Sequence, residues 1–211
     1  MKIGIVGSGR IGGLIGKLWS RAGHEVLFSS RNPQTLGGLV EQAGGSARAG
    51  TPEQAIAFGD AVLMSVPFLA LPEYGRTMAE TLGGKVVLDT SNPYPNRDGA
   101  MAEEVRRSGR GTGPYLREWF PGVHIVRAFN TVWDRTLESE AHRAGPRVGI
   151  PLASDDAEVM RIAAALVTDA GFDPVTVGPL DRSREFDMGT PVYDTGMSGP
   201  EVREALGLPQ A

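Results

Sequence analysis

Three glycines near the amino terminus follow the spacing G-x-G-x-x-G, in the order Gly7-Ser8-Gly9-Arg10-Ile11-Gly12. They come directly after the apolar run Lys2–Val6 and before a segment with helical apolar spacing, and this is the context in which the spacing binds a dinucleotide. There Gly7 permits the tight turn, Gly9 lets the backbone approach a pyrophosphate, and Gly12 lets the helix pack closely on the strand. The free N–H groups at the helix start favour the phosphates. The alternative is a glycine-rich turn that holds no ligand.

The second expected strand ends in Ser29-Ser30-Arg31-Asn32, which contains no carboxylate. A site that prefers NAD usually has Asp or Glu here for the ribose 2′-hydroxyl, whereas a nearby Arg accommodates the 2′-phosphate of NADP. Two hydroxyls and a guanidinium attract a phosphate that a carboxylate would repel. These residues predict NADP(H), and Arg10 is a candidate for a second cation. The alternative is that Arg31 is a solvated residue at the start of a loop.

Two polar clusters follow the next strands, at Ser65-Val66-Pro67-Phe68 and Ser91-Asn92-Pro93-Tyr94. Ligands of open parallel sheets bind outside the carboxyl ends of the strands. We therefore expect Ser65, Val66, Pro67, Asn92 and Pro93 to contact the cofactor. Ordinary turn chemistry is the alternative, since Asn-Pro pairs form turns.

A third polar cluster, Phe129-Asn130-Thr131, follows a later strand and should face a hydride acceptor. We expect Phe129 and Thr131 to contact that acceptor. Asn130 is the candidate catalytic residue, orienting a carboxamide or a ring carbonyl. The alternative is that Asn130 caps the helix that starts near Val132.

Other catalytic constellations are not evident in the sequence. The chain has three histidines, His24, His124 and His142, which lie at strand starts or on an expected helical surface. Strand starts lie opposite the expected site. No Ser/His/Asp order or metal-ligand spacing stands out, so we expect no metal. Direct hydride transfer between bound molecules requires placement and exclusion of water more than a proton relay.

The elements that must position these residues alternate between strands and helices. This alternation predicts an α/β fold, a Rossmann-type doubly wound and mostly parallel sheet. We expect residues 1–180 to form this domain and residues 181–211 a short C-terminal extension. The expected strands are Lys2–Val6, His24–Ser29, Ser46–Ala49, Ala61–Val66, Lys85–Thr90, His124–Phe129, Arg147–Ala153 and Pro174–Gly178. The expected helices are Ile11–Ala22, Gln34–Ala43, one starting at Thr51-Pro52, Leu69–Thr81, Ala100–Arg107, Pro114–Trp119 and Asp155–Ala170, the last capped by Ser154.

Composition excludes several classes of protein. The chain has 211 residues, 41% of them apolar, which is sufficient for a large core. Its net charge of −4 gives no support to nucleic-acid binding. It has no cysteine, which excludes disulfides and a cysteine nucleophile. No apolar run approaches membrane-spanning length and no secretory signal is apparent, so we expect no membrane association and a cytoplasmic location.

The segment from Arg106 to Gly113 is basic and rich in glycine. An irregular stretch inside a compact domain is usually functional or disordered. Arg106, Arg107 and Arg110 could bind an acidic part of the acceptor, since glycines let backbone amides reach an anion. The alternative is a solvated surface loop.

Several motifs resemble the coenzyme F420-dependent NADP oxidoreductases. They are the opening Met1–Gly12, Ser30-Arg31-Asn32-Pro33, Ser65-Val66-Pro67, Ala128-Phe129-Asn130-Thr131-Val132 and Val177-Gly178-Pro179-Leu180. The resemblance implies a Rossmann domain with a small C-terminal part, NADP(H) on the first half, F420 or a flavin as the small-molecule acceptor, and a homodimer. Apolar residues of the tail, among them Phe186, Val192 and Tyr193, also favour a homodimer, because they need cover.

The segment Arg106–Gly113 and the tail after Arg182 depart from the family pattern. An NADPH-dependent reductase of a small imine, ketone or acid is therefore one alternative, although such enzymes usually carry a large helical C-terminal domain. A non-catalytic NADP(H)-sensing module is the other alternative. It would keep the phosphate site and need no acceptor pocket.

Overall fold

The computed structural model describes residues 1–210, and its centre is an eight-stranded sheet in the order β3-β2-β1-β4-β5-β6-β7-β8. The strands are β1 (Lys2–Val6), β2 (Glu25–Ser29), β3 (Arg48–Gly50), β4 (Ala61–Met64), β5 (Val86–Asp89), β6 (His124–Arg127), β7 (Gly149–Ser154) and β8 (Asp173–Gly178). All neighbouring pairs are parallel except β6 and β7, which are antiparallel. The order reverses between β1 and β4, which places the ligand crevice of a doubly wound sheet beside these two strands. The predicted fold class is confirmed.

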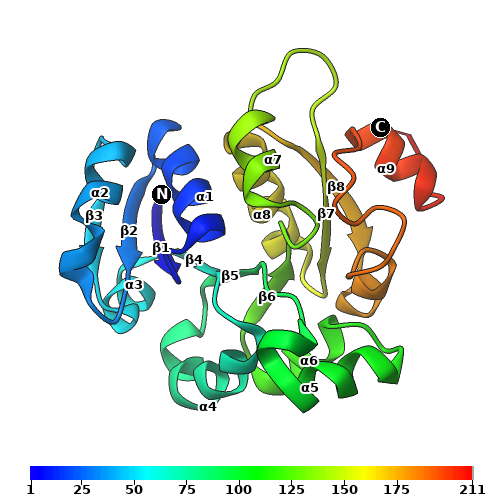
Figure 1. Cartoon of the computed structure of the whole chain (residues 1–211), viewed down its shortest axis with the longest axis horizontal. Coiled ribbons are helices and arrows are strands. Elements are labelled where there is room, and N and C mark those ends of the chain that lie inside the picture. The colour runs from blue at the N-terminus through cyan, green and yellow to red at the C-terminus, as the bar shows by residue number, and fades with distance from the viewer. Residues whose placement is uncertain (211) are drawn as a thin grey trace.

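Helices cover both faces of the sheet. They are α1 (Arg10–Arg21), α2 (Gly37–Ala43), α3 (Pro52–Phe58), α4 (Leu71–Leu82), α5 (Pro95–Ser108), α6 (Gly113–Trp119), α7 (Asp134–Ser139), α8 (Ala157–Asp169) and α9 (Gly199–Ala205), with 3-10 turns η1 (Pro33–Leu36), η2 (Phe68–Ala70) and η3 (Leu180–Glu185). Figure 1 shows α2 and α3 at one end of the sheet and α9 at the other. None of the helices within residues 1–210 has both the length and the apolar content that a membrane crossing needs.

Two apolar layers hold these helices against the sheet. On one face Ile15 and Trp19 of α1 and Leu166 of α8 pack over the strands, and the Trp19 Nε1–H donates to the Leu166 carbonyl at 2.7 Å. On the other face the core joins α3, α4 and α6, with Ile56 and Leu116 fully buried. Burial on both faces explains the nearly continuous apolar strands.

Helix caps and starts differ from the expectations in several places, and α5, for example, begins at Pro95 and not at Ala100. The helix α8 is capped by Asp156, whose carboxylate accepts from the Glu158 and Val159 N–H groups. The expected cap, Ser154, is instead the last residue of β7 and donates its hydroxyl to the Ile125 carbonyl at 2.7 Å. The short helix α7 begins at Asp134, two residues after the start near Val132 that the alternative for Asn130 required. By contrast, Thr51 and Gln54 form the capping box that starts α3.

The tail after η3 folds back on the last two strands. Phe186, Val192 and Val202 pack against Val175 and Val177 of β8, and the first three are at most 3% exposed. The chain therefore covers these apolar tail residues itself. The backbone N–H of Asp194 donates to the Thr131 carbonyl at 2.8 Å, which brings the tail to the carboxyl end of β6.

Candidate cofactor and acceptor site

The glycine turn between β1 and α1 has two glycines that packing requires and one that it does not. Gly7 has φ +92°, and a Cβ there would lie 2.3 Å from the Ser65 carbonyl oxygen. A Cβ on Gly12 would lie 2.2 Å from the Gly7 carbonyl oxygen. A Cβ on Gly9 would meet nothing within 4 Å, and no side chain caps α1. The space over Gly9 is therefore open to a ligand, beside uncapped N–H groups.

Hydrogen bonds join this turn to the end of β2. The Ser29 N–H donates to the Ser8 hydroxyl oxygen at 2.9 Å, and the Ser29 hydroxyl donates to the Ile5 carbonyl at 2.7 Å. Both serines therefore position the turn.

A cavity of about 650 Å³, which we call the β2-side cavity, opens beyond this point. Ser30, Arg31, Thr35 and Tyr74 are among its lining residues, and no carboxylate lines it within the described chain. Burial and the Glu53 charge raise the pKa of Tyr74, and the charge of the exposed Arg31 opposes that rise. The β2-side cavity is thus suited to an anionic group.

A second cavity of about 590 Å³, the β6-side cavity, lies at the carboxyl ends of β4, β5 and β6. Gly9, Ser65, Val66 and Pro67 line both cavities, which therefore meet at the glycine turn. The other lining residues of the β6-side cavity are Arg10, Ile11, Thr90, Ser91, Asn92, Tyr94, Asn96, Arg97, Phe129, Asn130, Val132, Trp133 and Asp134.

Some predicted site residues lie elsewhere. Arg10 lines the β6-side cavity and pairs with Asp134 at 2.9 Å, so it does not stand beside Arg31 as a second cation. Asn32 and Thr131 line neither cavity. Pro93 lines a separate cavity of about 240 Å³, with Arg106 and Arg184.

The expected basic loop is largely the end of α5, which includes Arg106 and Arg107. Arg110, in the turn that follows, pairs with Glu118 at 2.6 Å and lies over the Tyr115 ring. None of these three arginines lines the β6-side cavity.

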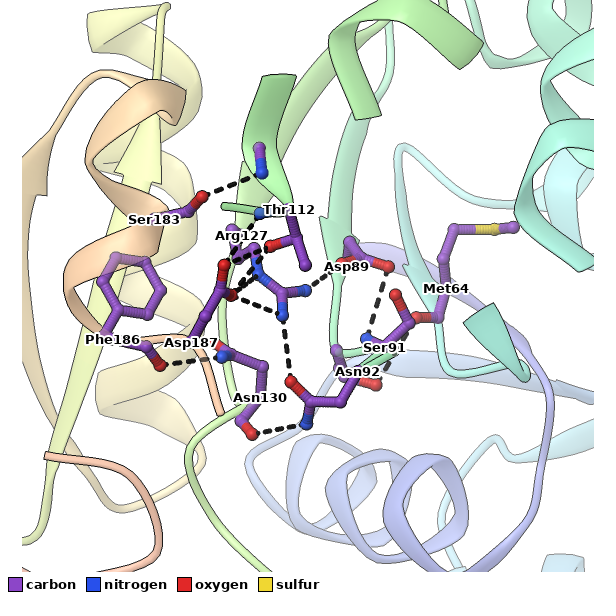
Figure 2. Close-up of polar contacts among 12 residues, drawn as sticks. Met64, Asp89, Ser91, Asn92, Thr112, Arg127, Asn130, Ser183, Phe186 and Asp187 are labelled. Carbon is purple, nitrogen blue, oxygen red and sulfur yellow. Dashed lines mark hydrogen bonds and ion pairs between the residues drawn. The ribbon is translucent and has the colours of Figure 1, made fainter. Parts of the chain in front are cut away.

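A buried ionic network around Arg127 contacts Asn92, which lines the β6-side cavity (Figure 2). Arg127 is fully buried and pairs with Asp89 of β5. Its Nε donates to Asp187 of the tail at 3.0 Å, and its Nη2 donates to Asn92 Oδ1 at 3.0 Å. Burial raises the pKa of Asp89, and the Arg127 charge opposes that rise. One guanidinium thus joins β5, β6 and the tail.

Asn130 is held by a strained backbone and a fixed amide. The preceding residue, Phe129, has φ +59°, and its ring packs edge-on between Trp19 and Phe172. A strained backbone conformation persists only where the surrounding structure holds it in place. Such conformations are common at functional sites. The Asn130 Nδ2 donates to the Phe186 carbonyl at 3.1 Å (Figure 2). Its Oδ1 is buried without a partner.

This arrangement decides between the alternatives for Asn130. The helix α7 begins at Asp134 with Trp133 at the cap position, so Asn130 is not a helix cap. Because Nδ2 is occupied, the free atom is an acceptor. It suits the N–H of a carboxamide and not a ring carbonyl. Ser91 also lines the cavity, and its hydroxyl oxygen is likewise buried without a partner.

Several residues of the site had no role predicted from the sequence. Tyr94 lines the β6-side cavity, and its hydroxyl lies 2.7 Å from that of Tyr193 in the tail. Trp133 lies on the rim, 43% exposed. The one available signal for Arg127 was a charge inside an otherwise apolar strand, His124–Phe129, because such a charge must be paired when buried.

Comparison with known proteins agrees with this geometry. Residues 2–93 match the model of the family described as NADP oxidoreductase, coenzyme F420-dependent. For the motifs within these residues, the match confirms the resemblance to that family. The rat metalloreductase STEAP3 (Rattus norvegicus) is 27% identical over 189 residues, which are 88% of this chain and 36% of that protein. The chain thus spans about a third of this curated relative.

Two solved structures share the fold over nearly their whole length. A hypothetical protein from Sinorhizobium meliloti has a TM-score of 0.76 and 24% identity, with 94% of this chain and 95% of that chain covered. A protein from Arthrobacter sp. FB24, whose assignment is an F420-dependent NADP reductase, has a TM-score of 0.75 and 20% identity, with 94% and 99% covered. The chain is thus related to NADP oxidoreductases in sequence and shares its fold with these structures.

Proposed function

We propose that this protein is an NADP(H)-dependent oxidoreductase that transfers a hydride between NADP(H) and a deazaflavin or flavin-type acceptor such as F420. The observation that carries the proposal is the pair of cavities that meet at Gly9. One has hydroxyls and Arg31 without a carboxylate, and the other has unpartnered polar atoms on Ser91 and Asn130. A dinucleotide that lies across the glycine turn would have its two ends in these two cavities.

The residues present suit NADP(H). Ser30, Arg31 and Thr35 would hold the 2′-phosphate, and the open backbone at Gly9 would hold the pyrophosphate. The buried Asn130 Oδ1 would accept from the carboxamide of the nicotinamide. When bound, the cofactor supplies the hydride, and the protein supplies placement and exclusion of water.

The walls of the β6-side cavity favour a flat acceptor. Trp133 stands on the rim, and Tyr94 lines the wall. Aromatic side chains stack on flat rings and contribute about 0.5–1.5 kcal/mol beyond buried area. A planar acceptor packed against Trp133 would also shield the nicotinamide from water.

An acceptor panel tests this function. We expect the protein to oxidise NADPH with F420, FMN or FAD, and the Trp133→Leu variant to raise the KM for that acceptor. Trp119→Leu, at an aromatic cluster with Phe68 outside both cavities, is the matched control for loss of an indole. Oxidation only with small imines, ketones or acids would contradict the planar acceptor.

The second candidate is a reductase of a small imine or carbonyl compound. The Tyr94 hydroxyl on the cavity wall favours it, since reduction of C=N or C=O requires a proton at the heteroatom. Binding of NADPH without turnover of any acceptor would instead favour the NADP(H)-sensing module.

We also propose a homodimer and a cytoplasmic location. The tail residues Phe186 and Val192 are covered within one chain, so the dimer does not depend on them. Met1, Leu69 and Trp133 are the exposed large apolar side chains of residues 1–210 that a second copy could contact. Light scattering at micromolar concentration tests the dimer, and a monomer would contradict it.

A further inference from the structure

A chain of hydrogen bonds runs from the buried Arg127 to the wall of the β6-side cavity. Arg127 Nη2 lies 3.0 Å from Asn92 Oδ1, and Asn92 Nδ2 lies 3.4 Å from the Tyr193 hydroxyl oxygen. The Tyr193 hydroxyl lies 2.7 Å from that of Tyr94, which lines the cavity. Tyr193 itself does not line the cavity, so Tyr94 separates it from any ligand there.

The chemistry of the groups sets the direction of this chain from Arg127 through Asn92 to Tyr193. A guanidinium can only donate, so Asn92 must turn its Oδ1 toward Arg127. Its Nδ2 then donates to the Asn130 carbonyl at 2.8 Å and to the Tyr193 oxygen. The Tyr193 oxygen accepts from Asn92. In the pair with Tyr94 either hydroxyl can be the donor, and when Tyr193 donates, the Tyr94 hydrogen is left for a group in the cavity.

We propose that Tyr94 is a proton donor to the acceptor in the β6-side cavity, with Tyr193, Asn92 and Arg127 holding its hydroxyl in place. The inference rests on the proposed function and deepens it, because it assigns the proton that accompanies the hydride. Tyr94 is the catalytic residue, whereas Asn92 and Arg127 are positioning residues.

The reaction balances as acceptor plus NADPH plus a proton, giving the reduced acceptor and NADP⁺. The acceptor gains two electrons and one hydrogen as the hydride. The O–H bond of Tyr94 then breaks as a nitrogen or oxygen of the acceptor takes the proton. Tyr94 then regains a proton from solvent through the β6-side cavity that it lines.

Charged groups surround the two phenols. Burial and the hydrogen bond with Tyr94 raise the pKa of Tyr193 well above its usual range, while the Arg127 charge opposes the rise and Asp194 adds to it. Tyr193 thus stays protonated and can hold Tyr94 by a hydrogen bond. The Arg97 guanidinium lies 5.0 Å from the centre of the Tyr94 ring. Asp98 is occupied by Arg97 and by the Tyr94 N–H.

Hydroxyl deletion tests the proposal with the full chain. General acids contribute about 10²–10⁴-fold to rate, so we expect Tyr94→Phe to lower kcat at least about 100-fold while the Kd for NADPH changes less than about twofold. Tyr193→Phe should give a smaller loss, because Tyr94 keeps its hydroxyl. Tyr115→Phe, on α6 and outside both cavities, is the matched control and should leave kcat unchanged.

The pH profile separates a proton donor from a structural role. Between about pH 6 and pH 9 a phenol stays protonated, so the rate of the unsubstituted protein should be flat. In Tyr94→Phe, where solvent must supply the proton, the rate should fall about tenfold per pH unit.

A second readout uses the protein without cofactor or acceptor. NMR of tyrosine labelled with ¹³C at Cζ follows the ionisation of each phenol. We expect Tyr94→Phe to lower the pKa of Tyr193, because the hydrogen bond with Tyr94 raises it. An unchanged Tyr193 pKa would overturn the hydrogen-bonded chain.

The outcomes distinguish this inference from the proposed function. A Tyr94→Phe variant with kcat within about threefold of the unsubstituted protein and a flat pH profile would overturn the proton donor alone. Absence of NADPH oxidation by the unsubstituted protein with every acceptor would overturn the proposed function and the proton donor with it.

Discussion

Replacement of Gly9 by valine should abolish cofactor binding without unfolding the protein. Gly9 has φ −74° and ψ −160°, an extended conformation that valine adopts, and a Cβ there would meet no atom within 4 Å. The cost to folding is therefore limited to the helix cap position, where exchanging a good cap residue for a poor one costs about 0.5–2 kcal/mol.

The cost to binding should be larger. The branched side chain would fill the open space over the turn and keep a pyrophosphate from the N–H groups of α1. Each hydrogen bond to a charged group contributes about 1.5–3 kcal/mol, so loss of two weakens binding by at least about 3 kcal/mol. This corresponds to an increase of more than about 100-fold in the Kd for NADPH.

Isothermal titration with NADPH and urea unfolding measure the two effects separately. Gly38→Val is the matched control, since Gly38 lies in α2 and a Cβ there also meets nothing within 4 Å. It should bind NADPH normally. Gly12→Val should unfold the protein, because its Cβ would lie 2.2 Å from a backbone oxygen. A folded Gly9→Val variant with unchanged affinity would refute the placement of the phosphates at this turn.

Three further substitutions test the cofactor preference and the ion pairs Arg127–Asp89 and Arg97–Asp98. Arg31→Ala should weaken NADPH about tenfold or more and leave NADH unchanged, because a charge-assisted contact contributes about 1.5–3 kcal/mol; equal losses in parallel titrations would count against the 2′-phosphate contact. Arg127→Met should destabilise the fold by about 3–5 kcal/mol, since it leaves Asp89 buried without its partner. Because burial raises the pKa of Asp89, the native variant binds more protons than the unfolded chain, and its stability in urea should rise as the pH falls; a pH-independent loss would contradict this. For Asp98, burial raises the pKa, but Arg97 and backbone N–H groups outweigh it and hold the pKa below its usual value. Asp98→Asn should therefore lose stability at neutral pH, and the difference from the unsubstituted protein should shrink progressively as the pH falls below about 4; a difference of equal size at neutral and strongly acidic pH would be the contrary result.

The cofactor half of the site was predictable because its chemistry lies in short segments. Gly7, Gly9 and Gly12 belong to one turn, and Ser30 and Arg31 follow the next strand by the rules of a doubly wound sheet. Local spacing and strand order are sufficient to place these residues.

The acceptor half depends on contacts between distant segments. Tyr94 and Tyr193 are 99 residues apart in sequence, and Arg127 meets Asp187 across 60 residues. Their contacts follow from the path of the tail over β7 and β8, which no local pattern specifies. Small errors were local: Ser154 and Asp156 both suit a helix cap, and only the length of β7 decides between them.

Arg10 shows how a correct motif can still mislead about one side chain. Its place in the glycine turn was predicted, but its side chain pairs with Asp134, at the start of α7, a contact that no local pattern specifies. Both residues of this ion pair line the β6-side cavity.

Titration of the unsubstituted protein with NADPH and with NADH tests the central claim most directly. The open Gly9 backbone and the β2-side cavity with Arg31 and without a carboxylate predict one site per chain. We expect NADPH to bind at least about tenfold more tightly than NADH, the effect of one charge-assisted contact. Equal affinities for the two cofactors, or no binding of either, would contradict the account.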